Sequence, residues 1–170
     1  MKNIYFILTL CVFASCSDSN RTIYGCLDPL ATNYSPNTDI DDGSCIYEAD
    51  IVFYLDANAA VYLGSQTNQI NFFIDESFVG YDSYPFTFSL SAPDCYQPGF
   101  VSATIQWYES SITSINWQLT DQSDNVFYDY DQIVDAGSGN QVLLTYSSLI
   151  NYAKENYLKI SAAIFLDVFL

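Results

Sequence analysis

From Ile51 onward, apolar and polar side chains alternate along much of the chain with a period of two residues. This alternation is typical of antiparallel strands that bury one face and expose the other to solvent. Residues 51–55 and 142–146 are more uniformly apolar, so we expect them to be central strands. The alternating runs predicted as strands are 70–74, 84–90, 101–107, 115–119 and 158–168.

Turn-forming residues separate these runs, since Asp, Asn, Ser, Gly and Pro gather between them. The clusters are Asp75-Glu76-Ser77, Pro93-Asp94, Pro98-Gly99, 121–125 and 137–140. About eight strands at this spacing predict an all-β fold, an antiparallel β-sandwich over residues 50–170. The run 158–170 would be its closing strand, or an edge that needs a partner.

One segment favours a helix. Residues 147–156 place Leu149, Ile150 and Ala153 on one side, with Ser147 as the predicted N-cap.

Charge and composition narrow the function classes. The chain has 20 acidic residues, 4 basic residues and no histidine, for a net charge of −16. Without an imidazole, Ser-His-Asp and Cys-His nucleophiles and His-ligated zinc or haem are excluded. With so few cations, a surface that tracks nucleic-acid phosphates is excluded as well. Because half of the residues are hydrophobic, the body should be globular.

The N-terminus has the pattern of an export signal. Lys2 precedes an almost wholly apolar run, residues 4–14, which is shorter than the roughly 20 residues that a membrane-spanning helix needs. Phe13-Ala14-Ser15-Cys16 resembles the bacterial lipobox, although Leu is commoner than Phe at its first position. The resemblance implies a signal peptide over 1–15, lipidation of Cys16, a tether over 16–24 and an outer-membrane lipoprotein that faces the periplasm or the surface. The alternative is an ordinary cleaved signal peptide, in which Cys16 has no role.

Residues 25–47 form a second motif. They resemble the short repeat G-C-x-D-x-x-A-x-N-Y-x-P-x-x-x-x-D-D-G-S-C of many secreted and surface proteins of Bacteroidota-type bacteria, and their Asp-rich end is similar to thrombospondin type 3 calcium repeats. The matching positions are Cys26, Asp28, Ala31, Asn33, Tyr34, Pro36, Asp41, Asp42, Gly43, Ser44 and Cys45. The resemblance identifies a module that precedes the sandwich, and it identifies no activity.

A segment this small needs a covalent staple. A disulfide between Cys26 and Cys45 would stabilise it by about 3 kcal/mol in the chain-entropy model. Cys95 is left over after lipidation and this pairing, so either it is a buried free thiol or the assumed pairing is wrong.

Oxygen ligands gather at the acidic end of the module. Asp28, Asp39, Asp41 and Asp42, with the amides of Asn33 and Asn37 nearby, are of the type that Ca²⁺ prefers. The full spacing of an EF-hand is missing, so a calcium site here would be weak or incomplete. The competing interpretation is that these carboxylates cap turns through hydrogen bonds.

Aromatic residues are the candidates for a binding surface. Tyr108, Tyr128 and Tyr130 lie beside polar or acidic positions and could recognise a partner if they are exposed. Trp107 and Trp117 could form a sugar-stacking platform, but both fall on the apolar phase of their strands, which favours core packing.

We therefore expect a cell-envelope lipoprotein with a structural or adhesive role and no enzyme activity. Its expected partners are the membrane, through the lipid anchor, and a glycan or an envelope protein, with no nucleic acid. One alternative is a calcium-dependent carbohydrate-binding lipoprotein. Another is a small hydrolase with paired acids, since twenty acidic residues supply some pair at a suitable distance, without a motif that selects one. Separately, five acids near residues 121–135 could hold a second Ca²⁺ or lie solvated in turns, and they are Asp121, Asp124, Asp129, Asp131 and Asp135.

Overall fold

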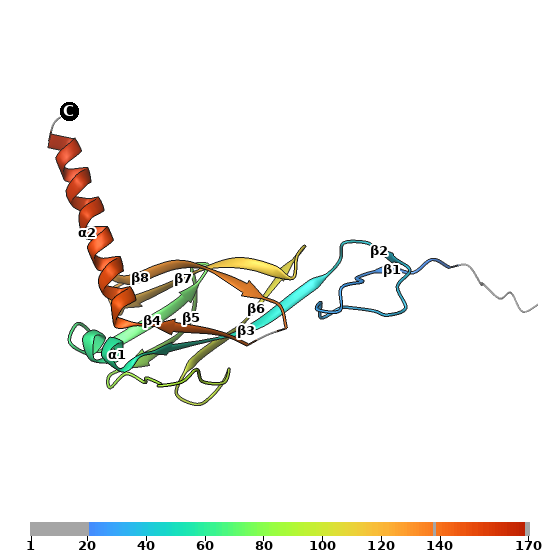
Figure 1. Ribbon diagram of the computed structural model, residues 1–170, viewed down its shortest axis with the longest axis horizontal. Coiled ribbons are helices and arrows are strands. Elements are labelled where there is room, and N and C mark those ends of the chain that lie inside the picture. The colour runs from blue at the N-terminus through green and yellow to red at the C-terminus, as the bar shows by residue number, and fades with distance from the viewer. Residues whose placement is uncertain (1–20, 138, 169–170) are drawn as a thin grey trace, which may run out of the picture.

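The computed structural model describes residues 21–137 and 139–168, and two β-sheets packed face to face form the body of the protein (Figure 1). The predicted all-β sandwich, preceded by a small disulfide-stapled module, is confirmed. The elements in chain order are β1 (Tyr24–Gly25), β2 (Ile40–Asp41), β3 (Ile46–Leu55), α1 (Ala57–Gly64), β4 (Gln69–Ile74), β5 (Ser77–Ser83), β6 (Val101–Tyr108), β7 (Ile112–Asp121), β8 (Val126–Asp135), β9 (Gly139–Leu144) and α2 (Tyr146–Val168).

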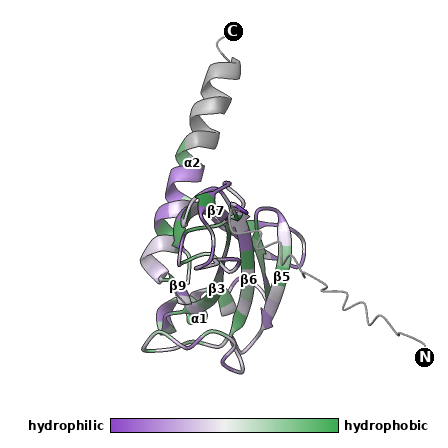
Figure 2. Ribbon diagram, turned by 90° about the vertical axis from the view of Figure 1, so that its right-hand side faces the viewer, coloured by the Kyte–Doolittle hydropathy of each residue, from purple (hydrophilic) through white to green (hydrophobic). Residues whose placement is uncertain are grey.

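One sheet has the strand order β5-β4-β7-β8 and is antiparallel throughout. The other has the order β6-β3-β9, in which β3 pairs antiparallel with β6 and parallel with β9. Phe53 of β3 joins the two layers, since its ring lies 5.1 Å from that of Phe72 in β4 and 5.4 Å from that of Trp117 in β7. Figure 2 shows hydrophobic stretches concentrated along the strands of this body.

The period-two pattern predicts the inward faces correctly. In β4, Ile70, Phe72 and Ile74 are buried and the residues between them are not. Residues 51–55 form the second half of β3, the middle strand of its sheet, and are buried almost throughout, as expected for a central strand. Residues 142–146 are not a central strand, because β9 lies at the edge of its sheet and ends at Leu144.

The predicted strand over residues 84–90 is wrong. Pro85 has no N–H to donate to a ladder, and this segment is a loop that touches the sheet through one bridge, between Phe88 and Leu55. Phe86 nevertheless points into the core and is buried. The strand next to β4 is β5, joined to it by the turn predicted at Asp75-Glu76, whose positive φ angles of 46° and 64° suit a two-residue hairpin.

Helix α1 was not predicted. The carboxylate of Asp56 caps its first turn by accepting a hydrogen bond from the backbone N–H of Ala59 at 2.6 Å. Ala59, Ala60 and Leu63 bury one side of the helix against the core. An Asp followed by a run of good helix formers is the sequence signal for this helix.

Helix α2 confirms the predicted helix at 147–156 and extends it. Its N-cap is Thr145 rather than Ser147, because the Thr145 hydroxyl accepts a hydrogen bond from the N–H of Ser148 at 3.1 Å. The predicted strand over residues 158–168 is wrong, since these residues continue the helix, and 169–170 lie outside the described residues. The stretch contains the good helix formers Leu158, Lys159, Ala162, Ala163 and Leu166, and the helix that precedes it propagates through it.

Among the side chains that the structure describes, those near the start of helix α2 pack against the body. The ring of Tyr152 lies 5.4 Å from Tyr128 of β8, and the ring of Tyr146 lies 5.5 Å from Tyr62 of α1. Beyond these contacts the helix projects away from the sandwich (Figure 1). Within residues 21–137 and 139–168, neither helix is long and apolar enough to cross a membrane.

Candidate functional site

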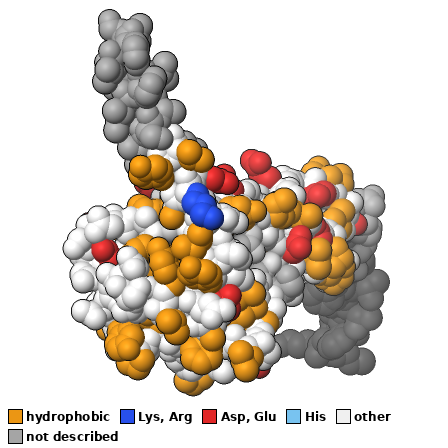
Figure 3. All heavy atoms as spheres, turned by 60° about the vertical axis from the view of Figure 1, so that its left-hand side comes forward, with side chains coloured by type: hydrophobic (Ala, Val, Ile, Leu, Met, Phe, Trp, Pro, Cys, Tyr) orange, Lys and Arg blue, Asp and Glu red, His pale blue; other side chains and the backbone are white. Residues whose placement is uncertain are grey.

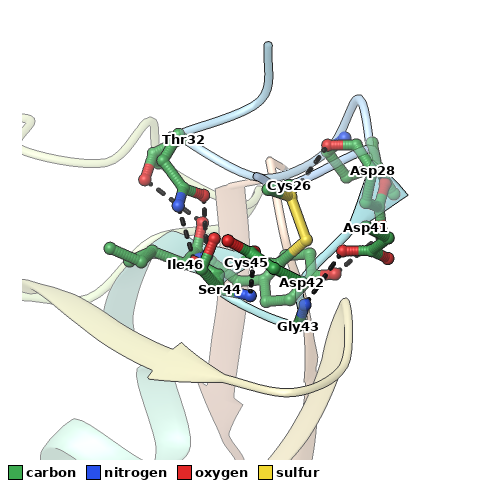
Figure 4. Close-up of a disulfide and its surroundings, with 12 residues drawn as sticks. Cys26, Asp28, Thr32, Asp41, Asp42, Gly43, Ser44, Cys45 and Ile46 are labelled. Carbon is green, nitrogen blue, oxygen red and sulfur yellow. Dashed lines mark hydrogen bonds between the residues drawn. A yellow bond between two sulfur atoms is a disulfide. The ribbon is translucent and has the colours of Figure 1, made fainter. Parts of the chain in front are cut away.

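The module over residues 25–47 is closed by the predicted disulfide. Cys26 and Cys45 are bonded, with 4.8 Å between their Cα atoms, and both are buried (Figure 4). Cys95 is a free, half-buried thiol, which settles the alternative left open by the sequence. Cys16, the expected lipidation site, lies outside the described residues.

Asn33 fastens the two ends of this module together, a role that the sequence did not predict. Its side-chain N–H donates to the carbonyl of Ser44 at 2.6 Å, and its side-chain oxygen accepts from the N–H of Ile46 at 2.9 Å. The backbone N–H of Thr32 donates to the carbonyl of Ile46 at 2.8 Å. The amide therefore serves the backbone rather than a metal ion.

Replacing Asn33 with alanine should lower the free energy of unfolding by about 1–3 kcal/mol, because two backbone groups lose their partner. Chemical denaturation of the purified protein measures this loss. Asn37→Ala is the matched control, since Asn37 is exposed in the same module and makes no hydrogen bond with any described residue. Equal stabilities for the two variants would contradict the role assigned to Asn33.

The side-chain carboxylate of Asp28 accepts two hydrogen bonds. One carboxylate oxygen accepts from the N–H of Leu30 and the other from the hydroxyl of Tyr47, both at 2.9 Å. Burial raises the pKa of the Tyr47 hydroxyl, and the hydrogen bond to Asp28 and the charges of Asp28 and Asp41 raise this pKa further. Asp28 thus links the acidic loop to the start of β3.

The other three predicted calcium ligands accept hydrogen bonds from backbone N–H groups. Asp41 and Asp42 each accept a hydrogen bond from the N–H two residues further on, at 3.1 and 3.0 Å, and Asp39 accepts from the N–H of Ile23 at 2.9 Å. Hydrogen bonds from Ser44 lower the pKa of the Asp42 carboxyl. The contacts of Asp41 and Asp42 match the turn-capping interpretation of the sequence, whereas that of Asp39 joins two segments far apart in the sequence.

Calcium binding by the module stays a prediction. In the part of the chain that the structure describes, no three Asp, Glu, Cys or His side chains are grouped so that they could hold a metal ion. If the loop nevertheless takes up Ca²⁺, millimolar Ca²⁺ should raise the Tm of the disulfide-intact protein. A melt that is the same in Ca²⁺ and in EDTA would contradict the prediction.

The module packs against the sandwich. Strand β3 begins one residue after Cys45, and the buried ring of Tyr47 stacks on Trp107 with 6.1 Å between ring centres. A second core cluster, separate from that of the sandwich, consists of Cys26, Ala31, Cys45, Tyr47 and Ala136. Trp107 is partly buried and packs against both clusters, so its role is to connect the module with the sandwich.

The structure brings two of the three candidate tyrosines together. Tyr130 is 54% exposed and its ring lies 6.0 Å from that of Tyr128, which is half-buried between Trp117 and Tyr152. Burial raises the pKa of the Tyr128 hydroxyl. Tyr108 is 62% exposed but belongs to β6 in the other sheet. Trp117, at 2% exposed, is a core residue, as its position in the alternation favoured.

The acids near β8 have polar partners of their own. Asp129 accepts hydrogen bonds from the side-chain amides of Asn116 at 2.7 Å and Gln118 at 2.9 Å, and Asp131 accepts from Asn116 at 3.0 Å. Asp121 accepts from three N–H groups of its own turn, and the side-chain amide among them lowers the pKa of the Asp121 carboxyl. These contacts give the acids structural roles in the turn and across the sheet face.

The free thiol of Cys95 should react slowly with alkylating reagents at neutral pH. Burial, and then the negative charges of Asp50 and Asp94, raise the pKa of this thiol, and only the thiolate is nucleophilic. The midpoint of the alkylation rate against pH should therefore lie above that of free cysteine, and Asp94→Asn should move it down. A midpoint at or below that of free cysteine would contradict this assignment.

Sequence reasoning missed a hollowed surface around α1. Two grooves, of about 410 and 480 Å³, flank this helix and share Val61 and Ser65 on the ridge between them. The first is walled by the loop that contains Tyr84 and Phe88, and the second by Tyr146 at the start of α2. The three walls come from distant parts of the chain, and the helix at their centre was not predicted, although Asp56 at its N-cap is a sequence signal for its start.

Comparison with known proteins assigns no function to these sites. No family model matches the chain, and neither a curated protein nor a solved structure matches it.

Proposed function

We propose that this chain is a cell-envelope lipoprotein with a structural or adhesive role and no catalytic activity. The observation that carries the proposal is the Cys26–Cys45 disulfide, because structural disulfides form outside the reducing cytosol. The apolar run at residues 4–14 and the lipobox-like residues before Cys16 supply the matching export signal. Acyl chains on Cys16 would hold the protein at a membrane, since each buried CH₂ contributes about 0.8 kcal/mol.

The arrangement of the chain suits an anchored protein. The cysteine-bracketed module lies at one end of the molecule, and α1 and the start of α2 lie at the other (Figure 1). Five residue steps separate Cys16 from Arg21, a span of at most roughly 17 Å. If the protein is anchored through Cys16, the membrane would therefore be close to the module, and the α1 end would face away from the membrane.

A binding role fits the polar chemistry better than catalysis does. The chain has no histidine, and Asp121, Asp129 and Asp131 near β8 accept hydrogen bonds from amides or backbone N–H groups. Meanwhile large apolar side chains are exposed at the α1 end, where Val61 is 75% and Tyr84 is 61% exposed. Exposed apolar side chains gathered in one region are typical of interaction surfaces.

Fractionation of cells that express the full chain or its Cys16→Ser variant tests the proposal. The full chain should sediment with membranes and resist a high-salt wash, because acyl insertion is not electrostatic, and the variant should be soluble. Both should retain the Cys26–Cys45 disulfide. A soluble full chain, or a variant that stays in the membrane, would contradict the anchor. Proteolysis of intact cells then shows whether the protein faces the periplasm or the medium.

A further inference from the structure

The two grooves beside α1 form one continuous aromatic surface. Val61 stands on the ridge that they share, with the rings of Tyr84 and Phe88 on one side and those of Tyr62 and Tyr146 on the other. Tyr84, Phe88 and Tyr146 are 61%, 50% and 43% exposed, so a large part of each side chain is open to solvent. Figure 3, which brings this end of the molecule forward, shows hydrophobic side chains gathered on the body below α2, with few acidic ones among them.

The walls of the grooves are held in place by contacts within the protein. Asp56 links α1 to α2, because one carboxylate oxygen accepts from the N–H of Ala59 at 2.6 Å and the other from the N–H of Tyr146 at 3.3 Å. The ring of Tyr84 lies so close to Gly64 that a Cβ there would stand 2.8 Å from a ring carbon. A rigid aromatic wall loses little entropy when it binds a ligand, which favours affinity.

The charge of the site selects the class of ligand. Neither groove is lined by an Asp, Glu, Lys or Arg side chain, while the whole chain carries a net charge of −16. The field of the protein opposes an anionic ligand, and the grooves offer no carboxylate to a cationic one. The site therefore suits an uncharged ligand.

Free polar groups stand beside the exposed rings. Within the described part of the chain, the side-chain amide of Asn58 and the hydroxyls of Tyr62, Tyr84 and Tyr146 make no hydrogen bond. A sugar ring has an apolar C–H face that stacks on an aromatic ring, and hydroxyls at its edge that pair with amides and phenols. Both groove volumes lie within the usual range of small-ligand sites, roughly 300–1,000 Å³.

A peptide suits the site less well. A bound peptide brings a backbone N–H and carbonyl at almost every residue, and these groups need hydrogen-bond partners. Some docking sites supply the partners from an open strand edge, and others bind the peptide as a helix, whose backbone groups bond to one another, in a deep apolar groove. The central wall here is α1, whose backbone groups bond within the helix, and the grooves are shallow and rimmed by hydroxyls.

We propose that the surface around α1, from Tyr84 and Phe88 across Val61 to Tyr62 and Tyr146, binds a neutral oligosaccharide. This inference rests on the adhesive role proposed above and names the ligand class for it. The site contains no acidic side chain, so binding requires no calcium.

The test uses the full-length chain in detergent micelles on an array of neutral oligosaccharides, uronic-acid oligosaccharides and apolar peptides, followed by titration calorimetry with the strongest neutral ligand. The expected result is retention of a neutral oligosaccharide, unchanged by EDTA. Tyr84→Ala should weaken binding at least tenfold, and Val61→Arg, which puts a charged side chain on the ridge, should weaken it similarly. Tyr108→Ala is the matched control because Tyr108 is equally exposed but lies on strand β6, outside the grooves, and it should stay within twofold of the unchanged protein.

Each other outcome overturns the proposal. An array without bound neutral glycans, obtained with protein whose circular dichroism is native, would refute it, and so would a preference for uronic acids or loss of binding in EDTA. Retention of peptides alone would make the surface a peptide-docking site. If Tyr84→Ala and Tyr108→Ala change the glycan affinity equally, the binding site is not the surface around α1. The array uses purified protein, so its result does not depend on the membrane fractionation. If the chain binds a neutral glycan but does not fractionate with membranes, the proposed anchor is wrong and the glycan-binding inference holds.

Discussion

Replacing Trp117 with alanine is expected to lower the free energy of unfolding by about 3–5 kcal/mol, the usual cost of truncating a large buried aromatic side chain. Trp117 is 2% exposed and lies between Phe53 of the opposite sheet and Tyr128 of β8, with ring centres 5.4 and 5.0 Å away. A domain of this size has a total stability of about 5–15 kcal/mol, so the loss should be visible as a large shift of the urea midpoint.

Trp117→Phe is the matched control for this substitution. The indole N–H of Trp117 is buried and has no hydrogen-bond partner in the described part of the chain. Phenylalanine keeps most of the ring contacts and removes this unpaired donor, so the expected loss is below about 1.5 kcal/mol. If the phenylalanine and alanine variants lose the same stability, the contribution of Trp117 is not ring packing between the sheets.

Removing the disulfide through the double substitution of Cys26 and Cys45 by alanine should cost about 3 kcal/mol, since the bridge closes a loop with a sequence separation of 19. The damage should be local. The two cysteines belong to the small cluster around Tyr47, while Trp117 belongs to the larger cluster of the sandwich. Limited proteolysis should therefore cut the double variant within residues 26–45 before it cuts the body.

Cys95→Ala is the control, because Cys95 is unpaired and half-buried, and its loss should change stability by no more than about 0.5 kcal/mol. Cleavage that starts throughout the sandwich in the double variant would show that the disulfide supports the whole fold. That result would contradict the separation of the two clusters.

Sequence periodicity predicts the fold well where one face of a strand is buried. Residues 70–74, 101–107 and 115–119 alternate and all lie in strands of the sandwich. The same alternation misleads at 84–90, where Pro85 prevents a ladder, and at 158–168, where helix formers continue a helix that has already started. Helix α1 is too short for its period to be evident in the sequence.

The candidate sites differ in the same way. The Cys26–Cys45 pair, predicted from the motif, depends on residues close in sequence, and so does the capping role of Asp41 and Asp42, which was the alternative to their predicted calcium binding. The grooves depend on Tyr84 and Tyr146, which are brought together only by tertiary packing around α1. Local patterns therefore reveal the module, whereas the hollowed surface is visible only in three dimensions.

The mass of the mature protein isolated from cells tests the central claim, that the chain is exported, cleaved and lipidated, most directly. The account predicts a polypeptide that begins at Cys16, carries the added mass of acyl chains, contains the Cys26–Cys45 disulfide and has one thiol, Cys95, open to alkylation after unfolding. A polypeptide that begins at Met1, carries no acyl mass and alkylates at all five cysteines would contradict it.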